Sequence, residues 1–180
     1  MKNNLKTFFL YLAFLISSHY SFSQYTSGGF GGFSVMLMKF GDAGIGAAYG
    51  GMGGAVFAEN GYLGGFGYGG AATKDNRTVA IGYGGLMGGI ITSVTPRQKI
   101  APGLRIGFGG FVNVEENPLD NSKITTSDNL LRLDPNVMYL YELLQNFKLQ
   151  ITAGYSLNLI GNQRDFNSAF FSVGFVLGSL

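Results

Sequence analysis

Hydrophobic and polar residues alternate with a period of two along most of the chain after about Phe33. The pattern is clearest over residues 149–160, "LQITAGYSLNLI". One face of this segment carries Leu149, Ile151, Ala153, Tyr155, Leu157 and Leu159, and the other carries Gln150, Thr152, Gly154, Ser156 and Asn158. Such alternation predicts a β-strand with one apolar face and one polar or small face. The segment is also longer than the roughly five or six residues that are usual for strands in soluble proteins.

Glycines gather on one face of two further alternating segments, 79–91 ("VAIGYGGLMGGII") and 104–114 ("LRIGFGGFVNV"). A glycine inside a strand costs backbone entropy and packs no side chain, so its repeated use needs a reason. We expect the glycine faces to line the inside of a tightly curved sheet, where there is little room. The bulky residues opposite them should then point outward: Val79, Ile81, Tyr83, Met87 and Ile91 in the first segment, and Leu104, Ile106, Phe108, Val112 and Val114 in the second.

About eight segments are expected to form strands, near residues 30–40, 45–58, 62–72, 78–92, 103–114, 130–144, 148–160 and 169–179. Every connection is compatible with antiparallel neighbours, and Asn60-Gly61 is a strong signal for a two-residue hairpin turn. The predicted fold class is therefore all-β, a single up-and-down antiparallel barrel of about eight strands. One alternative stays open, because Pro135 cannot donate to a strand ladder and could instead begin a helix at Asn136.

Alternate connections of such a barrel lie at opposite ends. One set is "GDAG", "TKDNR", "EENPLDNSKITTSDN" and "GNQRDFN", and the other is "ENG", "SVTPRQKIAP" and "QN". The first set contains the longest connection, residues 115–129, which we interpret as a solvated loop. Short turns at one end and longer loops at the other are typical of barrels in bacterial outer membranes.

The first residues predict a secretory signal peptide. Lys2 and Lys6 precede the apolar run "TFFLYLAFLIS", and Ser21 and Ser23 are spaced as in a cleavage site. We expect cleavage before Gln24, which divides the chain into a signal peptide over 1–23 and a barrel domain over 24–180. The apolar run is about half of the roughly 20 residues that a membrane-spanning helix needs.

Composition excludes several kinds of chemistry after Gln24. The twelve basic residues include Lys2 and Lys6, so basic and acidic side chains balance in the remaining chain and no nucleic-acid partner is expected. The chain has no cysteine and its single histidine, His19, lies in the signal peptide. No catalytic triad, cysteine nucleophile or histidine-bound zinc is therefore available.

No cofactor, metal or enzymatic activity is expected. The stretch "GFGYGG" matches a dinucleotide-binding glycine pattern, but no helical pattern follows it, as such a site requires. The acidic residues of 115–129 lack the glycine-centred alternation of a calcium loop. We therefore predict that the protein is not an enzyme and that it holds no bound cofactor.

The glycine pattern resembles that of a group of small outer-membrane-barrel-type proteins of the Bacteroidetes. The resemblance rests on "GGMGGAVF", "GGFGYGG" and "GYGG", and on the ending "FFSVGFVLGSL". It covers roughly residues 33–180. Because the group carries no assigned activity, the resemblance implies only an outer-membrane location and a barrel fold. One departure is Leu180, since outer-membrane barrels commonly end in an aromatic residue.

Five polar residues are predicted to share the barrel interior: Arg105, Arg132, Asp134, Glu142 and Gln150. Opposite charges facing a lumen should pair, because an unpaired buried charge is costly. The pairing favours a structural plug of salt bridges and hydrogen bonds. A polar pathway or a ligand site through the lumen is the other interpretation.

The sequence therefore predicts an integral outer-membrane barrel that is exported by the Sec pathway. We expect it to have a structural or accessory role and a mostly filled lumen. Its expected partner is outer-membrane lipid, and the sequence names no protein partner. The alternative is an exported soluble lipocalin-like barrel that binds a small apolar ligand. A lipid-modifying membrane enzyme is disfavoured, because small barrels of that kind generally use a histidine in catalysis.

Overall fold

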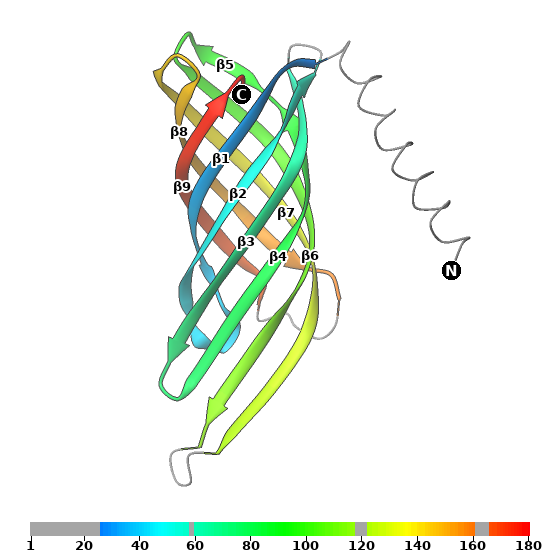
Figure 1. Ribbon diagram of the computed structural model, residues 1–180, viewed down its shortest axis with the longest axis vertical. Coiled ribbons are helices and arrows are strands. Elements are labelled where there is room, and N and C mark those ends of the chain that lie inside the picture. Colours follow the sequence, from blue (N-terminus) through cyan, green and yellow to red (C-terminus); the bar gives the residue numbers. More distant parts are fainter. Residues whose placement is uncertain (1–25, 58–59, 118–121, 161–165) are drawn as a thin grey trace, which may run out of the picture.

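The chain forms a closed antiparallel barrel (Figure 1). The computed structural model describes residues 26–57, 60–117, 122–160 and 166–180, so the predicted signal peptide lies outside the described residues. The strands are β1 (Thr26–Lys39), β2 (Ile45–Phe57), β3 (Gly61–Lys74), β4 (Arg77–Ile90), β5 (Thr92–Thr95), β6 (Gln98–Glu116), β7 (Lys123–Leu144), β8 (Phe147–Asn158) and β9 (Ser168–Gly178). A short 3-10 turn, η1 (Gly41–Ala43), joins β1 to β2.

Eight of these strands make the ring, and this confirms the predicted fold class. Each pairs with its neighbours in chain order, β4 pairs with β6, and β9 closes the ring on β1. The four-residue strand β5 pairs only with the start of β6. The closed ring leaves no long unpaired sheet edge along the barrel wall.

The two predicted sets of connections lie at opposite ends of the barrel (Figure 1). We call the end that holds the C-terminus and the start of β1 the terminal end. The other end, with η1, the β3–β4 turn and the β6–β7 connection, is the hairpin end. At the hairpin end β6 and β7 extend beyond the other strands.

Residues 115–129 are mostly strand, so their interpretation as a long loop was wrong. β6 runs to Glu116 and β7 begins at Lys123, with Glu116 paired to Lys123 and Val114 to Thr125. The β-branched residues in "KITT" favour extended backbone and continue the ladder. "SVTPRQKIAP" is likewise a hairpin of β5 and β6 rather than an open loop.

The helix considered after Pro135 does not form, because β7 continues through the proline. Pro135 lies opposite Leu104 in β6, and no residue of β8 pairs with it. A proline has no N–H to donate, so the interrupted β7–β8 ladder accommodates it. The apolar residues that follow continue the strand and alternate between the two faces of the wall.

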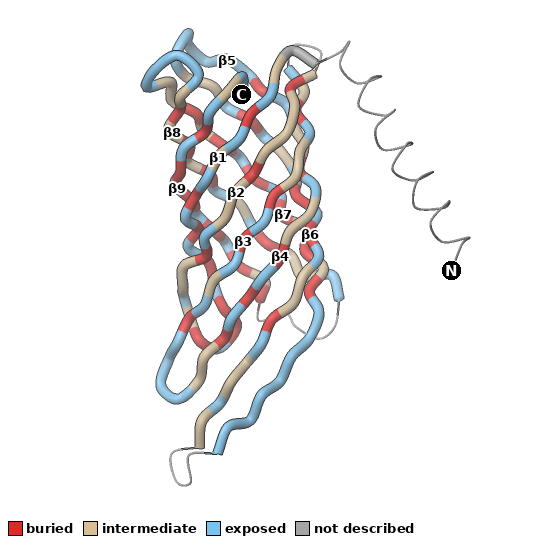
Figure 2. Tube along the Cα trace, viewed as in Figure 1, coloured by how far each residue is buried: buried red, intermediate tan, exposed pale blue. Residues whose placement is uncertain are grey.

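Burial alternates along the strands, so each strand has an inward and an outward face (Figure 2). In β6 and β8 the faces are those that the sequence predicts. Leu104, Ile106 and Phe108 are exposed, whereas Arg105 and Thr152 are buried. The polar and small face of β8 therefore lies inside, and the aliphatic face of β6 lies outside.

The predicted faces of β4 are reversed. Val79, Ile81, Tyr83, Met87 and Ile91 are all buried inside the barrel, with exposed fractions of 2–6%. Their neighbours Gly82, Gly84 and Gly88 are on the outward face with Leu86. A strand rich in both glycine and bulky apolar residues is compatible with either face, so its period alone cannot decide the orientation.

The neighbouring strands explain this orientation. Tyr83 pairs in register with Gly109 of β6, and a Cβ at Gly109 would overlap the backbone and Cβ of Tyr83. The ring of Tyr83 packs against Phe66 and Tyr68 of β3, with centroid separations of 5.7 and 6.2 Å. Large side chains of one strand thus fill space that glycines of the next strand leave open.

Inward glycines allow the strands to approach closely, as the sequence analysis expected in general. An added Cβ would overlap backbone atoms of the adjacent strand at Gly50, Gly54, Gly64, Gly70, Gly85, Gly109 and Gly174. At outward Gly67 and Gly82 an added Cβ would meet no atom within 4 Å. The curvature of the wall therefore crowds the inner face and opens the outer face.

Gly109→Ala should lower the free energy of unfolding by about 1–3 kcal/mol, because the added methyl group overpacks the inner wall. Gly82→Ala is the matched control and should be neutral or stabilising by up to about 1 kcal/mol, since its Cβ points into open space. Urea unfolding of the refolded barrels, followed by far-UV circular dichroism, measures both. Equal destabilisation by the two changes would contradict the assignment of faces.

Candidate functional site

Three of the five predicted polar residues meet in the middle of the lumen. Arg105 of β6 lies opposite Asp134 of β7 in the ladder, and Arg132 precedes Asp134 by two residues on the same inward face. Their exposed fractions are 1% for Arg105 and 0% for both Arg132 and Asp134. The structure therefore brings these three residues together in the barrel interior. We call them the luminal cluster.

Asp134 is held from two sides. Its Oδ1 atom is 3.7 Å from Nε of Arg132, which makes a long ion pair. The hydroxyl of Tyr83 donates to Oδ2 of Asp134 over 3.4 Å. The guanidinium of Arg132 also lies over the ring of Tyr83, 4.6 Å from its centroid. Tyr83 therefore contacts both charges of the pair. The sequence pattern predicts Tyr83 on the outward face of β4, so it does not indicate this role.

Arg105 is surrounded by aromatic rings rather than by acceptors. Its guanidinium lies 5.6 Å from the ring centroid of Phe66, 5.5 Å from that of Tyr68 and 5.9 Å from that of Phe170. None of its three side-chain nitrogens has a hydrogen-bond partner among the described residues. The ring faces attract the cation and offset part of its desolvation.

The other two predicted residues lie nearer the terminal end. Gln150 is fully buried, and its amide Nε2 donates to Oγ1 of Thr152 over 2.8 Å. Glu142 is half-buried and pairs in register with Lys148, whose ammonium donates to the carbonyl oxygen of Gly178. The structure therefore does not bring Glu142 or Gln150 into the luminal cluster.

Buried apolar residues lie on both sides of the luminal cluster. Towards the hairpin end, the next inward residues are Ile81 on β4 and Leu130 on β7, with exposed fractions of 5% and 0%. Towards the terminal end, Met87, Met138 and Leu140 are buried to 2% or less. The arrangement can hold charges in a fixed place, and the inward face of β8 adds the buried polar side chains of Gln150, Thr152 and Ser156 beside it.

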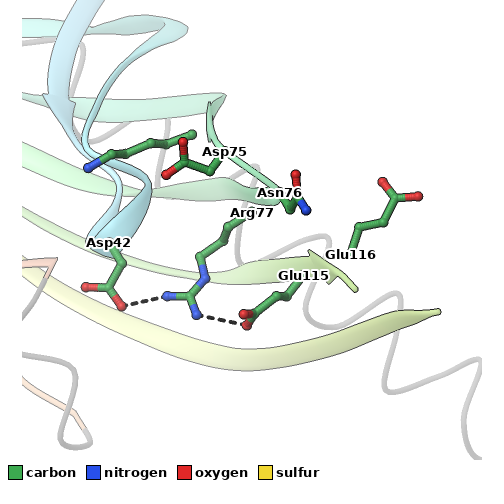
Figure 3. A pocket seen from close by; sticks show the side chains of 7 residues that line it. Asp42, Asp75, Asn76, Arg77, Glu115 and Glu116 are labelled. Carbon is green, nitrogen blue, oxygen red and sulfur yellow. Dashed lines mark hydrogen bonds and ion pairs between the residues drawn. The ribbon is translucent and has the colours of Figure 1, made fainter. Parts of the chain in front are cut away.

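A second polar site lies at the mouth of the hairpin end (Figure 3). Nη1 of Arg77 is 2.8 Å from Oδ2 of Asp42, and Nη2 is 2.8 Å from Oε2 of Glu115. Arg77 thus joins η1 to β6 across the start of β4. These side chains line a cavity of about 410 Å³ together with Lys74, Asp75, Asn76 and Glu116.

A smaller cavity of about 170 Å³ adjoins the first and shares Asp42 and Arg77 with it. Val79, Phe111 and Phe166 form its apolar lining, and the two phenylalanine rings lie 4.6 Å apart between centroids. Asn113 and Thr126 add polar groups, and the buried Oδ1 atom of Asn113 has no hydrogen-bond partner among the described residues. We call the two cavities together the mouth pocket. The sequence pattern does not indicate this pocket, because the polar residues of 115–129 favour a loop in place of the strands that line it.

Two further features bear on the chemistry of the described residues. They contain no group of three or more acidic, histidine or cysteine side chains placed to hold a metal ion. They also contain no helix with the length and hydropathy needed to cross a membrane.

Solved structures with the same fold include several outer-membrane proteins. A major outer membrane protein from Thermus thermophilus aligns with a TM-score of 0.62 and 14% identity, over 85% of this chain and 100% of that one. Neisserial surface protein A aligns with a TM-score of 0.60 and 14% identity, over 83% of this chain and 96% of that one. The fold is that of small outer-membrane β-barrels.

The attachment invasion locus protein Ail of Yersinia pestis has the same barrel fold, with a TM-score of 0.55 and 10% identity, over 86% of this chain and 99% of that one. No protein-family model matches the chain, and no curated protein sequence matches it significantly. At these identities the likeness concerns the fold, so the function has to be argued from the residues of this chain.

Asp134→Leu should destabilise the barrel by about 3–5 kcal/mol, because it leaves Arg132 buried without its carboxylate. The double change Arg132→Met with Asp134→Leu should recover most of this loss, since an apolar pair of similar volume replaces the ion pair. Urea unfolding of the wild type, both single variants and the double variant gives the coupling energy. Additive effects would show that the two side chains do not act as a pair.

Proposed function

We propose that the protein is an integral outer-membrane barrel, exported by the Sec pathway, whose walls contact lipid. The observation that carries the proposal is the outer surface. Among the described residues, 25 large hydrophobic side chains are exposed, including Phe108 at 59% and Leu86 at 68%. Exposed apolar surface of this extent marks a membrane or protein contact.

The distribution of charge supports the same proposal. The exposed charged residues of the described chain lie at the two ends of the barrel: Lys39, Asp42, Lys74, Asp75, Glu115, Lys123 and Asp128 at the hairpin end, and Arg97 at the terminal end. The charges of the luminal cluster face inward. A charge is tolerated inside a barrel or at the interfaces but costs several kcal/mol (roughly 2–4) on the lipid face near the midplane.

The topology supports an orientation. β1 begins and β9 ends at the terminal end, which has a two-residue turn at Gln145 and Asn146; the hairpin end has a two-residue turn at Asp75 and Asn76 but also the long extension of β6 and β7 (Figure 1). β6 and β7 project from the opposite end. Because short turns face the periplasm and longer connections face outward in such barrels, the hairpin end faces the exterior of the cell.

Within this location the protein has a structural or accessory role, with a mostly filled lumen. The buried apolar residues on both sides of the luminal cluster support a plug rather than a conducting pathway. No observation on the described residues supports an enzymatic activity, and the proposed role needs none. Lipid is the partner that the outer surface favours.

A soluble lipocalin-like carrier is the second candidate. Such a barrel would place polar side chains outside and an apolar ligand cavity inside. The interior here does contain Met36, Met38 and Met52 with several aromatic rings, which gives the idea some support. However, the lumen also holds two arginines and an aspartate, and the outside carries the large aliphatic residues.

Phe108→Lys should prevent or strongly impair folding into lipid vesicles, because it places a charge on the lipid face of β6. Thr125→Lys is the matched control: Thr125 is exposed on the outward face of the projecting part of β7, opposite Val114, so its change should be mild. The shift in gel mobility between unboiled and boiled samples measures the folded fraction. If both lysine variants fold equally well in buffer without lipid, the soluble carrier is the better proposal.

The wild-type barrel should carry no stable ion current in planar lipid bilayers, because apolar residues fill the lumen on both sides of the luminal cluster. A general diffusion porin incorporated under the same conditions serves as the positive control. Reproducible single-channel steps from the wild-type protein would show that the lumen is an open pathway.

A further inference from the structure

The mouth pocket combines an apolar floor with carboxylate and amide acceptors. Asp42 and Glu115 each use one carboxylate oxygen for Arg77, and both side chains are more than half exposed, so their second oxygens are open to a ligand. The Oδ1 atom of Asn113 is buried in the same place without a donor. An unpaired buried acceptor is costly, so the pocket favours a ligand that supplies hydrogen-bond donors.

The charge of the pocket favours a positive ligand. Its lining contains Asp42, Asp75, Glu115 and Glu116, but only Lys74 and Arg77 as cations. Outside the lining, Lys123 lies 3.7 Å from Glu116 and offsets part of that charge. Arg77 remains charged at any relevant pH and can balance only one of the two carboxylates that it bridges. An anion would therefore meet a net negative surface.

The lining of the smaller cavity favours an organic cation over a metal ion. No cluster of three acidic side chains within the described residues is placed to hold a metal. The floor instead consists of the paired rings of Phe111 and Phe166 with Val79. Aromatic faces attract ammonium groups and also pack against hydrocarbon chains.

We propose that the mouth pocket binds a small organic cation, an alkyl chain that carries one or two primary ammonium groups. The chain lies against Phe111 and Phe166. One ammonium group donates to Oδ1 of Asn113 and to the free carboxylate oxygen of Glu115 or Asp42. Such charge-assisted hydrogen bonds are stronger than neutral ones and give the site its preference.

Three ligands of matched length and different charge test this proposal: butane-1,4-diamine, butane-1,4-diol and succinate. Isothermal titration calorimetry on the refolded barrel in a zwitterionic detergent at low salt measures binding of each. We expect the diamine alone to bind, and its affinity should fall as sodium chloride is added. Tighter binding of the diol or of succinate, or no binding of the diamine, would overturn the proposal.

Variants distinguish binding of the diamine in the mouth pocket from its general attraction to an acidic surface. Glu115→Gln and Asn113→Ala should each weaken diamine binding, by about tenfold and about fivefold. Asp128→Asn removes a charge at the same end but outside the pocket, so it should change the affinity by less than about twofold. Equal weakening by Glu115→Gln and Asp128→Asn would mean that only surface charge is sensed. Because the test uses the folded barrel in detergent, its outcome is independent of whether the barrel resides in the outer membrane.

Discussion

Closure of eight strands around a narrow lumen is the constraint on which the rest of the structure depends. The ring can close only if the inner faces of neighbouring strands leave room for one another. Inward glycines provide this room, and large side chains occupy it: Tyr83 faces Gly109, and the rings of Phe66 and Tyr68 pack beside Tyr83. The glycine-rich stretches are therefore positions of close backbone approach within a regular barrel wall, and they line a core that is packed with side chains.

The barrel buries charged groups among the apolar side chains of its interior. Two arginines and one aspartate are buried in the lumen, while leucine, isoleucine, valine and phenylalanine side chains cover the outside. The aromatic rings around Arg105 and the Tyr83 hydroxyl beside Asp134 stabilise these charges in place of water. The apolar outer surface suits lipid surroundings better than aqueous ones.

The mouth pocket is built from elements that are far apart in the sequence. η1 contributes Asp42, β4 contributes Arg77, and β6 contributes Asn113 and Glu115. The ladder between β4 and β6, in which Arg77 pairs with Glu115, brings the arginine to the edge of the lumen. The two ion pairs of Arg77 are exposed and add little to stability. They place Asp42 and Glu115 in the wall of the mouth pocket, which Phe111 and Phe166 also line.

The sequence by itself determined the strands, their antiparallel order and the closed barrel, because alternation and turn residues are local signals. It also placed Arg105, Arg132 and Asp134 on inward faces, since the opposite faces of β6 and β7 are strongly apolar. Only the tertiary structure decided the orientation of β4, whose two faces are both apolar or small and so carry no local preference. It likewise separated Glu142 and Gln150 from the luminal cluster and assembled the mouth pocket, because register across several strands, and not the period within one strand, sets which side chains meet.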